Sequence, residues 1–288
     1  MNPDSLPPVT SNLPHLPAPV SMVDGIPCYS PDRSGNEADY PLEAHSRLFA
    51  IEDRSFWFRG RNRILRWMLA SCREGEACKF LEIGCGTGFV LKMVADAFPL
   101  WEVYGSDLHL AALSFARRRN VRATLFQADI TQFPGGAWCD VVGLFDVIEH
   151  LADDVMFLKA AREMLRPGGR MIISVPQHPW LWSAHDCRAG HKRRYTRAEL
   201  QAKLAEAGLS AVRTTSYVTA LLPVLAIQRW IGRMWRNTGP GDSSRALAPG
   251  AVLNAVFGTA LRIDEAAIRA GFSLPWGGSL LAVAQRPV

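Results

Sequence analysis

Short apolar runs alternate with helical patterns through the middle of the chain. Buried strands are predicted for residues 79–83, 102–107, 123–129, 139–145 and 171–176. Between these runs, apolar residues recur at helical spacing over 90–98, 110–119 and 155–165. Strands that alternate with helices form parallel sheets through right-handed crossovers, so this order predicts a three-layer α/β fold. Ligands of such sheets bind at the carboxyl ends of the strands.

The flanking regions extend this pattern. Helices are predicted over 61–72 and 196–208, and strands over 210–218 and 279–286, which gives a sheet of seven mostly parallel strands. Nine of the nineteen prolines lie before residue 42, and they predict a disordered leader over 1–42 because proline interrupts helix and sheet alike. We therefore divide the chain into that leader, a core over 43–216, an insertion over 217–277 and a final core strand within 278–288.

The insertion is too long for a plain connection between two strands. Its first part, 217–236, is an apolar run broken by Pro223 that continues as a helix. One face of that helix carries Arg229, Arg233 and Arg236, and the opposite face carries Ile227, Ile231 and Trp235. A second amphipathic helix is predicted over 252–272, folded against the first, with a flexible loop over 237–250 between them. We favour a lid over an apolar acceptor pocket; contact with an anionic membrane surface and a homodimer interface stay open.

Composition and charge narrow the class of protein only slightly. The chain of 288 residues has 32 basic and 27 acidic side chains, a net charge of +5 that falls short of a dedicated nucleic-acid-binding protein. Its six cysteines include no CxxC pair, which predicts free thiols and no zinc site. Neither a secretory signal nor a run of ~18 apolar residues is present, so we expect a cytoplasmic protein, with peripheral membrane contact through the insertion as the open alternative.

A glycine-rich turn joins the first predicted strand to the next helix. The segment LEIGCGTG places Glu82 two residues before Gly84, with Gly86 and Gly88 following. Glycine lets the backbone approach a ligand closely, because it lacks a Cβ and tolerates positive φ. Dinucleotide sites use the spacing GxGxxG with a pyrophosphate at the helix N-terminus, whereas the spacing here is GxGxG. A carboxylate beside the loop repels a pyrophosphate but binds an ammonium group, so a nicotinamide-nucleotide dehydrogenase is the less favoured alternative.

Further acids follow the next strands. Asp107 ends the second strand, where it is placed to accept hydrogen bonds from ribose hydroxyls. Asp129 ends the third strand and is placed to meet an adenine amino group. Asp146 and Glu149 follow the fourth strand. Together with Glu82, these carboxylates favour a cationic ligand that contains an adenosine.

With these motifs in order, the chain resembles class I S-adenosylmethionine-dependent methyltransferases, in particular the small-molecule branch that includes quinone-precursor O-methyltransferases. The resemblance spans about residues 50–215 and includes LEIGCGTG, DVVGLFDVIEHL and LRPGGRMIISVP. It implies a Rossmann-like fold and methyl transfer from S-adenosyl-L-methionine to an oxygen or carbon of a small, lipophilic metabolite. An anionic group on that metabolite is compatible with the resemblance. It also implies cofactor contacts from Glu82, Gly84, Gly86, Gly88, Asp107, Leu108, Asp129, Ile130 and Phe145. A non-catalytic cofactor-binding scaffold is the alternative.

Candidates for a catalytic base lie at the same edge of the sheet. His150 follows the fourth strand, and the loop 176–197 after the fifth supplies His178, His185 and Tyr195. If the acceptor is an alkene attacked at carbon, aromatic faces stabilise the cation instead; Trp57, Phe58, Trp180 and Trp182 are the candidates. A metal site made of His185, Asp186 and His191 is conceivable, but no helical HxxxH spacing supports it, and we expect no metal.

Two basic clusters complete the candidate chemistry. The segment 115–122, FARRRNVR, follows helical periodicity and is expected to be a solvated face. The segment 191–197, HKRRYTR, lies at the rim of the site and is a candidate for binding a carboxylate or phosphate on the acceptor. In the first helix, Arg59 or Arg61 is a candidate for the cofactor's carboxylate. RNA methylation needs a wide positive face, so nucleic acid is not the expected partner.

Overall fold

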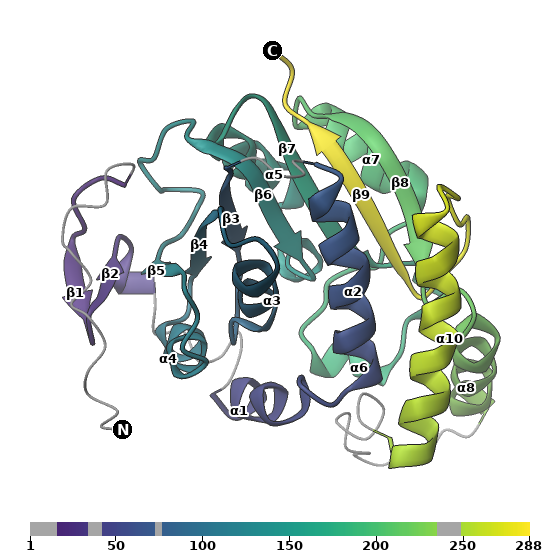
Figure 1. The fold of residues 1–288 in the computed structure, drawn as a ribbon. Helices are drawn as coiled ribbons and strands as arrows, with labels where there is room; N and C mark the ends of the chain where they lie inside the picture. The colour runs from purple at the N-terminus through teal and green to yellow at the C-terminus, as the bar shows by residue number, and fades with distance from the viewer. Residues whose placement is uncertain (1–15, 34–41, 73–76, 235–248) are drawn as a thin grey trace.

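The computed structural model describes residues 16–33, 42–72, 77–234 and 249–288. They form one sheet of nine strands in the order β1-β2-β5-β4-β3-β6-β7-β9-β8 (Figure 1). All seven predicted strands are present: β3 (Lys79–Ile83), β4 (Glu102–Asp107), β5 (Thr124–Gln127), β6 (Cys139–Phe145), β7 (Leu165–Pro176), β8 (Ser210–Tyr217) and β9 (Ser279–Gln285). Strands β3 to β7 pair in parallel, and β9 pairs antiparallel with β7 and β8. The predicted α/β class with a mostly parallel core is confirmed.

Two further strands come from the segment that we predicted to be a disordered leader. β1 (Ser21–Val23) and β2 (Ile26–Cys28) form a hairpin, and β2 extends the sheet by pairing with β5 at Gln127. The hairpin turn is Asp24-Gly25, with both residues at positive φ, the conformation that a two-residue type I′ turn needs. The prediction was therefore wrong for this part of the leader, because an Asp-Gly turn between apolar residues outweighed the proline content. Residues 1–15 and 34–41 lie outside the described part of the chain.

Helices cover both faces of the sheet (Figure 1). One face carries α2 (Phe56–Ala70), α3 (Phe89–Ala97), α4 (Leu110–Arg118) and α10 (Ala251–Arg269). The other face carries α5 (Asp154–Met164) and α7 (Arg197–Glu206). Each layer buries its own apolar cluster against the sheet, as the predicted three-layer fold requires.

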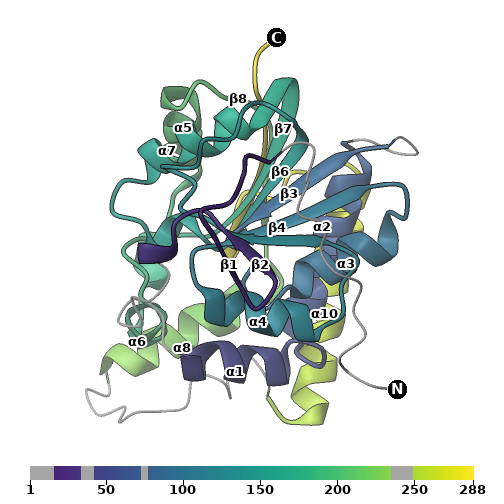
Figure 2. The same ribbon diagram turned by 90° about the vertical axis from the view of Figure 1, so that its left-hand side faces the viewer.

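Shorter elements gather where the parallel strands end. Figures 1 and 2 show α1 (Leu42–Ile51), α6 (Ala184–Arg188) and α8 (Leu222–Met234) at that edge. Two 3-10 turns, η2 (Ile148–His150) and η3 (Pro179–Leu181), follow β6 and β7. The sequence starts α6 with a capping box, in which Ser183 and Asp186 exchange hydrogen bonds with each other's backbone. Every segment after a parallel strand therefore contributes to one edge, where a ligand is expected.

In its described residues the insertion forms the helices α8 and α10, but these two do not pack mainly on each other. α10 lies against α2, where Leu261 fills the space above Gly60. α8 instead lies against η3. The two helices are linked through the buried carboxylate of Asp264, which accepts hydrogen bonds from the backbone amides of Thr219 and Ala220 just before α8. Trp235, Arg236 and most of the predicted flexible loop lie outside the described residues. Within those residues, no helix is both long and apolar enough to cross a bilayer.

Candidate functional site

The three glycines of the turn between β3 and α3 have different surroundings. Gly84, Gly86 and Gly88 all have positive φ, between 55° and 75°. At Gly84 a Cβ would lie 2.6 Å from Val147, and at Gly88 it would lie 2.9 Å from the Cβ of Ala116, so neighbouring segments exclude a side chain at both positions. At Gly86 a Cβ would meet no atom within 4 Å. Gly86 is thus the point where the backbone is open to a ligand.

Asp107 fixes this turn from the neighbouring strand. Its Oδ2 atom accepts a hydrogen bond of 2.8 Å from the Gly86 amide, and its Oδ1 atom accepts one of 2.9 Å from the His109 amide. Each carboxylate oxygen has a second acceptor position, so both can still bind ligand hydroxyls. The residue assigned to ribose therefore also holds the glycine loop.

One cavity of about 1530 Å³ runs along the carboxyl edge of the sheet. Its volume exceeds the ~300–1,000 Å³ of a typical single-ligand pocket, which leaves room for a cofactor and an acceptor. The predicted site residues that line it are Glu82, Gly84, Gly86, Asp107, Leu108, Asp129, Ile130, Phe145, His150 and His185. Gly88 does not line the cavity, since it packs against α4.

The cofactor end of the cavity contains buried polar groups without protein partners. Glu82 is 3% exposed, and its Oε2 atom has no hydrogen-bond partner among the described residues. The Ser106 hydroxyl, on the neighbouring strand β4, is fully buried and likewise has no hydrogen-bond partner within the described part of the chain. Burial raises the pKa of the Glu82 carboxyl well above its ordinary value, although the Arg61 charge opposes the shift. Such groups need a bound ligand to supply their hydrogen bonds, and an ammonium group would satisfy the carboxylate.

Asp129 has partners that the sequence did not reveal. Its Oδ1 atom accepts hydrogen bonds from the Thr131 amide and hydroxyl, and its Oδ2 atom lies 3.0 Å from Arg33 Nη1. Arg33 ends η1 (Pro31–Arg33), directly after the hairpin, and lines the cavity. The predicted leader therefore forms part of the wall at the adenine side.

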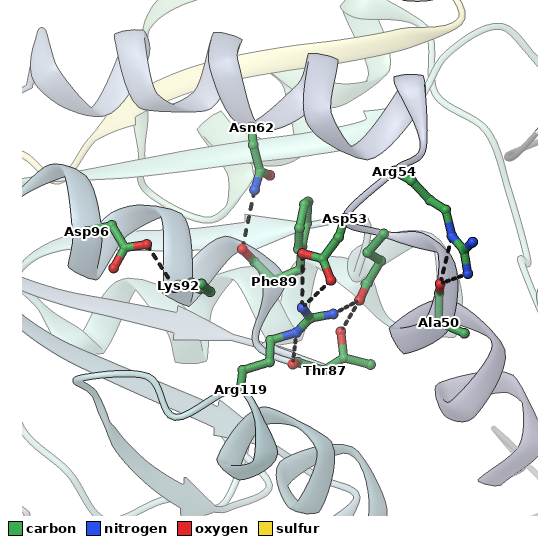
Figure 3. A network of polar contacts seen from close by, with 10 residues as sticks. Ala50, Asp53, Arg54, Asn62, Thr87, Phe89, Lys92, Asp96 and Arg119 are labelled. Atoms are coloured by element: carbon green, nitrogen blue, oxygen red, sulfur yellow. Dashed lines mark hydrogen bonds and ion pairs between the residues drawn. The ribbon is translucent and has the colours of Figure 1, made fainter. Parts of the chain in front are cut away.

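Arg119 clamps the glycine loop to the segment before α2. Its guanidinium donates to the Thr87 carbonyl at 2.8 Å and pairs with Glu52 and Asp53 (Figure 3). Glu52 in turn accepts a hydrogen bond of 2.6 Å from the Thr87 hydroxyl. The predicted solvated face was wrong at this residue, because the Arg119 side chain is only 4% exposed and lies over the rings of Phe49 and Phe89.

Arg59 and Arg61, the two candidates for the cofactor's carboxylate, differ in burial. Arg59 is exposed, whereas Arg61 is buried and lines the cavity. Arg61 Nη1 lies 2.5 Å from Asp146 Oδ2, and the other oxygen of Asp146 accepts a hydrogen bond from Ser174. The Nε atom of Arg61 is buried and has no hydrogen-bond partner in the part of the chain that the structure describes. A positive group with an unused donor at this position suits a ligand carboxylate.

The far end of the cavity is polar and rich in histidine. Glu149, His150, His185 and His191 line it. Burial lowers the pKa of His150 to about 4, and the neighbouring His191 adds to the shift. Burial likewise lowers the pKa of His185 to about 4, against the opposing charge of Asp186. Both imidazoles are therefore neutral at physiological pH and able to accept a hydrogen bond from an acceptor hydroxyl.

Two predicted catalytic residues lie outside the cavity. The Tyr195 hydroxyl is buried and donates at 2.7 Å to Asp154 on α5. Burial, and then this hydrogen bond, raises its pKa. The ring of His178 stacks on those of Trp180 and Trp276. Neither lines the cavity, and we withdraw both as candidate bases. Among the aromatic candidates, Trp57, Phe58 and Trp182 line it and Trp180 does not.

The second basic cluster serves mainly internal contacts. Arg193 pairs with Asp154, and Arg194 donates to Asp186 at 2.7 Å and to the Gln177 carbonyl at 3.0 Å. Lys192 is exposed and lines the cavity. Of this cluster, Lys192 is the side chain best placed to meet an acceptor anion. No local pattern in the sequence indicates that acids hold these arginines.

Fold and site together describe an α/β protein with a large cavity, lined by several carboxylates, at the carboxyl edge of its sheet. Over residues 46–214, more than half of its length, the chain matches the methyltransferase domain family, and it belongs to that family. A probable S-adenosylmethionine-dependent methyltransferase of Mycolicibacterium smegmatis is 29% identical over 177 residues, covering 60% of this chain and 67% of that protein. A ubiquinone biosynthesis O-methyltransferase of Cereibacter sphaeroides is 36% identical over 110 residues, covering 34% and 41%.

Solved structures confirm the fold. A putative methyltransferase of Haloferax volcanii, crystallised with a methyltransferase activator, superposes with a TM-score of 0.57 at 17% identity, covering 88% of this chain and 98% of that one. A [4+2]-cyclase superposes with a TM-score of 0.51 at 16% identity, covering 78% and 82%, so the fold alone does not fix the reaction. The family match does: this chain is a methyltransferase that uses S-adenosyl-L-methionine to methylate a small molecule.

The residues of the cavity fit this cofactor. The unpaired Glu82 carboxylate suits its ammonium group, Arg61 suits its carboxylate, and Asp107 suits its ribose hydroxyls. When bound, the cofactor supplies a methyl group on a positively charged sulfur. The protein's own task is to hold an acceptor atom in line with that methyl group, an effect worth up to ~7–11 kcal/mol.

Proposed function

We propose that this enzyme methylates a hydroxyl oxygen on a small molecule with an apolar body. The observation that carries this proposal is the composition of the cavity beyond the cofactor residues. Its walls are apolar, and they end in a cluster of uncharged imidazoles and one buried carboxyl group. An apolar body fits the walls, and a hydroxyl fits the polar end.

The inserted helices supply part of the apolar wall. Val224 and Leu225 of α8 and Phe257 of α10 line the cavity. Trp57 of α2 and Trp182 of the loop after β7 also line it. We therefore interpret the insertion as an acceptor-binding cover, which agrees with the lid interpretation. The family relation to a ubiquinone biosynthesis O-methyltransferase supports a hydroxyl acceptor on a lipophilic molecule.

A labelling experiment with blocked acceptors tests the proposal. The protein is incubated with methyl-labelled S-adenosylmethionine and matched pairs of compounds: phenols with apolar chains, and the same compounds with the hydroxyl already methylated. We expect label in the phenols and none in the blocked partners. Label in both members of a pair would indicate carbon methylation and would contradict the proposal. Tight cofactor binding without transfer to any compound, including those of a cell extract, would support the non-catalytic scaffold instead.

A further inference from the structure

Three side chains from two separate segments meet at the polar end of the cavity. Glu149 and His150 belong to η2 after β6, and His191 belongs to the loop after α6. One potential ligand atom of each lies within 4.8 Å of those of the other two. The rings of His150 and His191 meet edge to face, with centroids 4.9 Å apart. His185, which the sequence grouped with His191, has its ring centroid 6.3 Å from that of His191 and is not part of this cluster.

Glu149 has no partner that explains its burial. The residue is 0% exposed, yet neither carboxylate oxygen has a hydrogen-bond partner among the described residues. The His191 Nε2 atom is 4.0 Å from Glu149 Oε1, which is too far for a hydrogen bond. An ionised carboxylate lacks a donor here, and a neutral carboxyl lacks an acceptor for its proton, so both forms are unfavourable without a ligand. A cation between Glu149 and the two imidazoles removes this conflict.

A carboxylate orients the imidazole of His191, as is usual for histidines that bind metals. Its Nδ1 atom lies 3.0 Å from Asp186 Oδ1, and an ionised carboxylate can only accept, so Nδ1 carries the proton. The Nε2 atom is then unprotonated and lies on the side of Glu149. Asp186 is itself fully buried and is fixed by Arg194 and by the Ser183 backbone. A carboxylate that orients a ligating imidazole from behind is a recurrent feature of protein metal sites.

We propose that Glu149, His150 and His191 bind a divalent first-row transition cation of the Zn²⁺ type. Two imidazole nitrogens and one carboxylate suit such an ion better than Mg²⁺ or Ca²⁺, which prefer oxygen ligands. Three protein ligands leave an open position, as in catalytic zinc sites. Resting on the proposed function, we assign that position to the hydroxyl oxygen of the acceptor. Coordination lowers the pKa of a hydroxyl, so its proton passes to solvent; the anionic oxygen then bonds to the methyl group as the bond from sulfur to methyl breaks and the neutral thioether leaves.

Binding of Co²⁺, a coloured substitute for Zn²⁺, tests the site without relying on activity. The full chain is freed of metal with a chelator and titrated with Co²⁺, and Zn²⁺ is then added as a competitor. We expect one equivalent to give visible absorption that Zn²⁺ abolishes. Glu149→Gln and His191→Ala should abolish the signal, and Asp186→Asn should weaken binding roughly 10- to 100-fold. His178→Gln, outside the cavity, is the matched control and should bind as wild type.

The outcomes separate this inference from the proposed function. Absence of a Co²⁺ signal in the wild type, or an unchanged signal in both Glu149→Gln and His191→Ala, would overturn the metal site. Labelled phenol formed by that same metal-free protein would leave the proposed function intact. Thermal melting of each variant identifies loss of folding; if one variant fails to fold, the other decides, since they alter segments on either side of the cluster.

Discussion

At the scale of single residues, Asp107 shows how one carboxylate serves both the protein and its ligand. Its position after a strand predicts a ribose contact. The structure adds that both oxygens accept backbone hydrogen bonds, one of them from Gly86 at the open point of the glycine loop. Removing the charge therefore affects the loop and the ligand together.

We predict that Asp107→Asn weakens S-adenosylhomocysteine binding by about 1–3 kcal/mol. An amide offers one acceptor oxygen instead of two, so either the Gly86 amide or the His109 amide loses its partner. Calorimetric titration measures the change. Asp96→Asn, on the exposed surface of α3, is the control and should leave the affinity as it is. Equal affinity in Asp107→Asn and wild type would remove Asp107 from the cofactor site.

The predicted catalytic residues show where reading single positions fails. His150 and His185 line the cavity, whereas His178 and Tyr195 do not, although all four lie after strands at the same edge. Side-chain direction in a loop depends on local backbone and on partners elsewhere, such as Asp154 for Tyr195. His191 also lines the cavity, and its sequence signal is local, because Asp186, five residues earlier, contacts its Nδ1 atom.

At the scale of elements, the site depends on how segments are tied across the sheet edge. Arg119, directly after α4, connects the glycine loop at Thr87 with Glu52 and Asp53 after α1 (Figure 3). α1 also packs against α4. This junction places the segment before α2, including the cavity residue Glu52, over the cofactor end of the site.

We predict that Arg119→Lys weakens S-adenosylhomocysteine binding roughly 10-fold, or ~1.4 kcal/mol. Lysine keeps the charge but cannot reach Thr87, Glu52 and Asp53 at once with the planar fork of a guanidinium. The dissociation rate, followed by stopped-flow fluorescence, should rise. Arg118→Lys, at the neighbouring exposed position, is the matched control. The same rate in both variants would show that the junction does not restrain the cofactor.

At the scale of the whole molecule, the sheet extends beyond the seven predicted strands. The hairpin β1-β2 covers the outer edge of β5, and Ile26 and Cys28 join the buried residues of the protein. Beyond the hairpin, Tyr29 packs edge to face on Phe126 and Phe133, and Arg33 reaches Asp129. The segment thus closes a sheet edge and one wall of the site together.

We predict that Ile26→Asp lowers the free energy of unfolding by roughly 1–3 kcal/mol, because a charge replaces a buried side chain. Ile26 is 5% exposed. Val20→Asp, at a neighbouring position that is 72% exposed, introduces the same charge and should change stability little. Urea denaturation measures both. Similar midpoints for the two variants would mean that the hairpin contributes nothing to the stability of the fold.

The sequence by itself determined the class of fold, the order of the seven core strands along the chain and the cofactor. Alternating periodicities, a GxGxG turn and acids at strand ends are local signals, and a parallel sheet brings its carboxyl ends together whatever the loops do. The Asp24-Gly25 turn is likewise a local sequence signal for the hairpin. The prolines around it favoured the prediction of disorder instead.

Only the tertiary structure decided which side chains share the cavity and which pair with distant acids. Arg33 with Asp129, Arg119 with Glu52 and Arg61 with Asp146 each join segments far apart in the chain. α10 likewise packs on α2 and not chiefly on its sequence neighbour α8. Such pairings depend on the register and packing of whole layers, and periodicity along the chain carries no information on distances across the sheet.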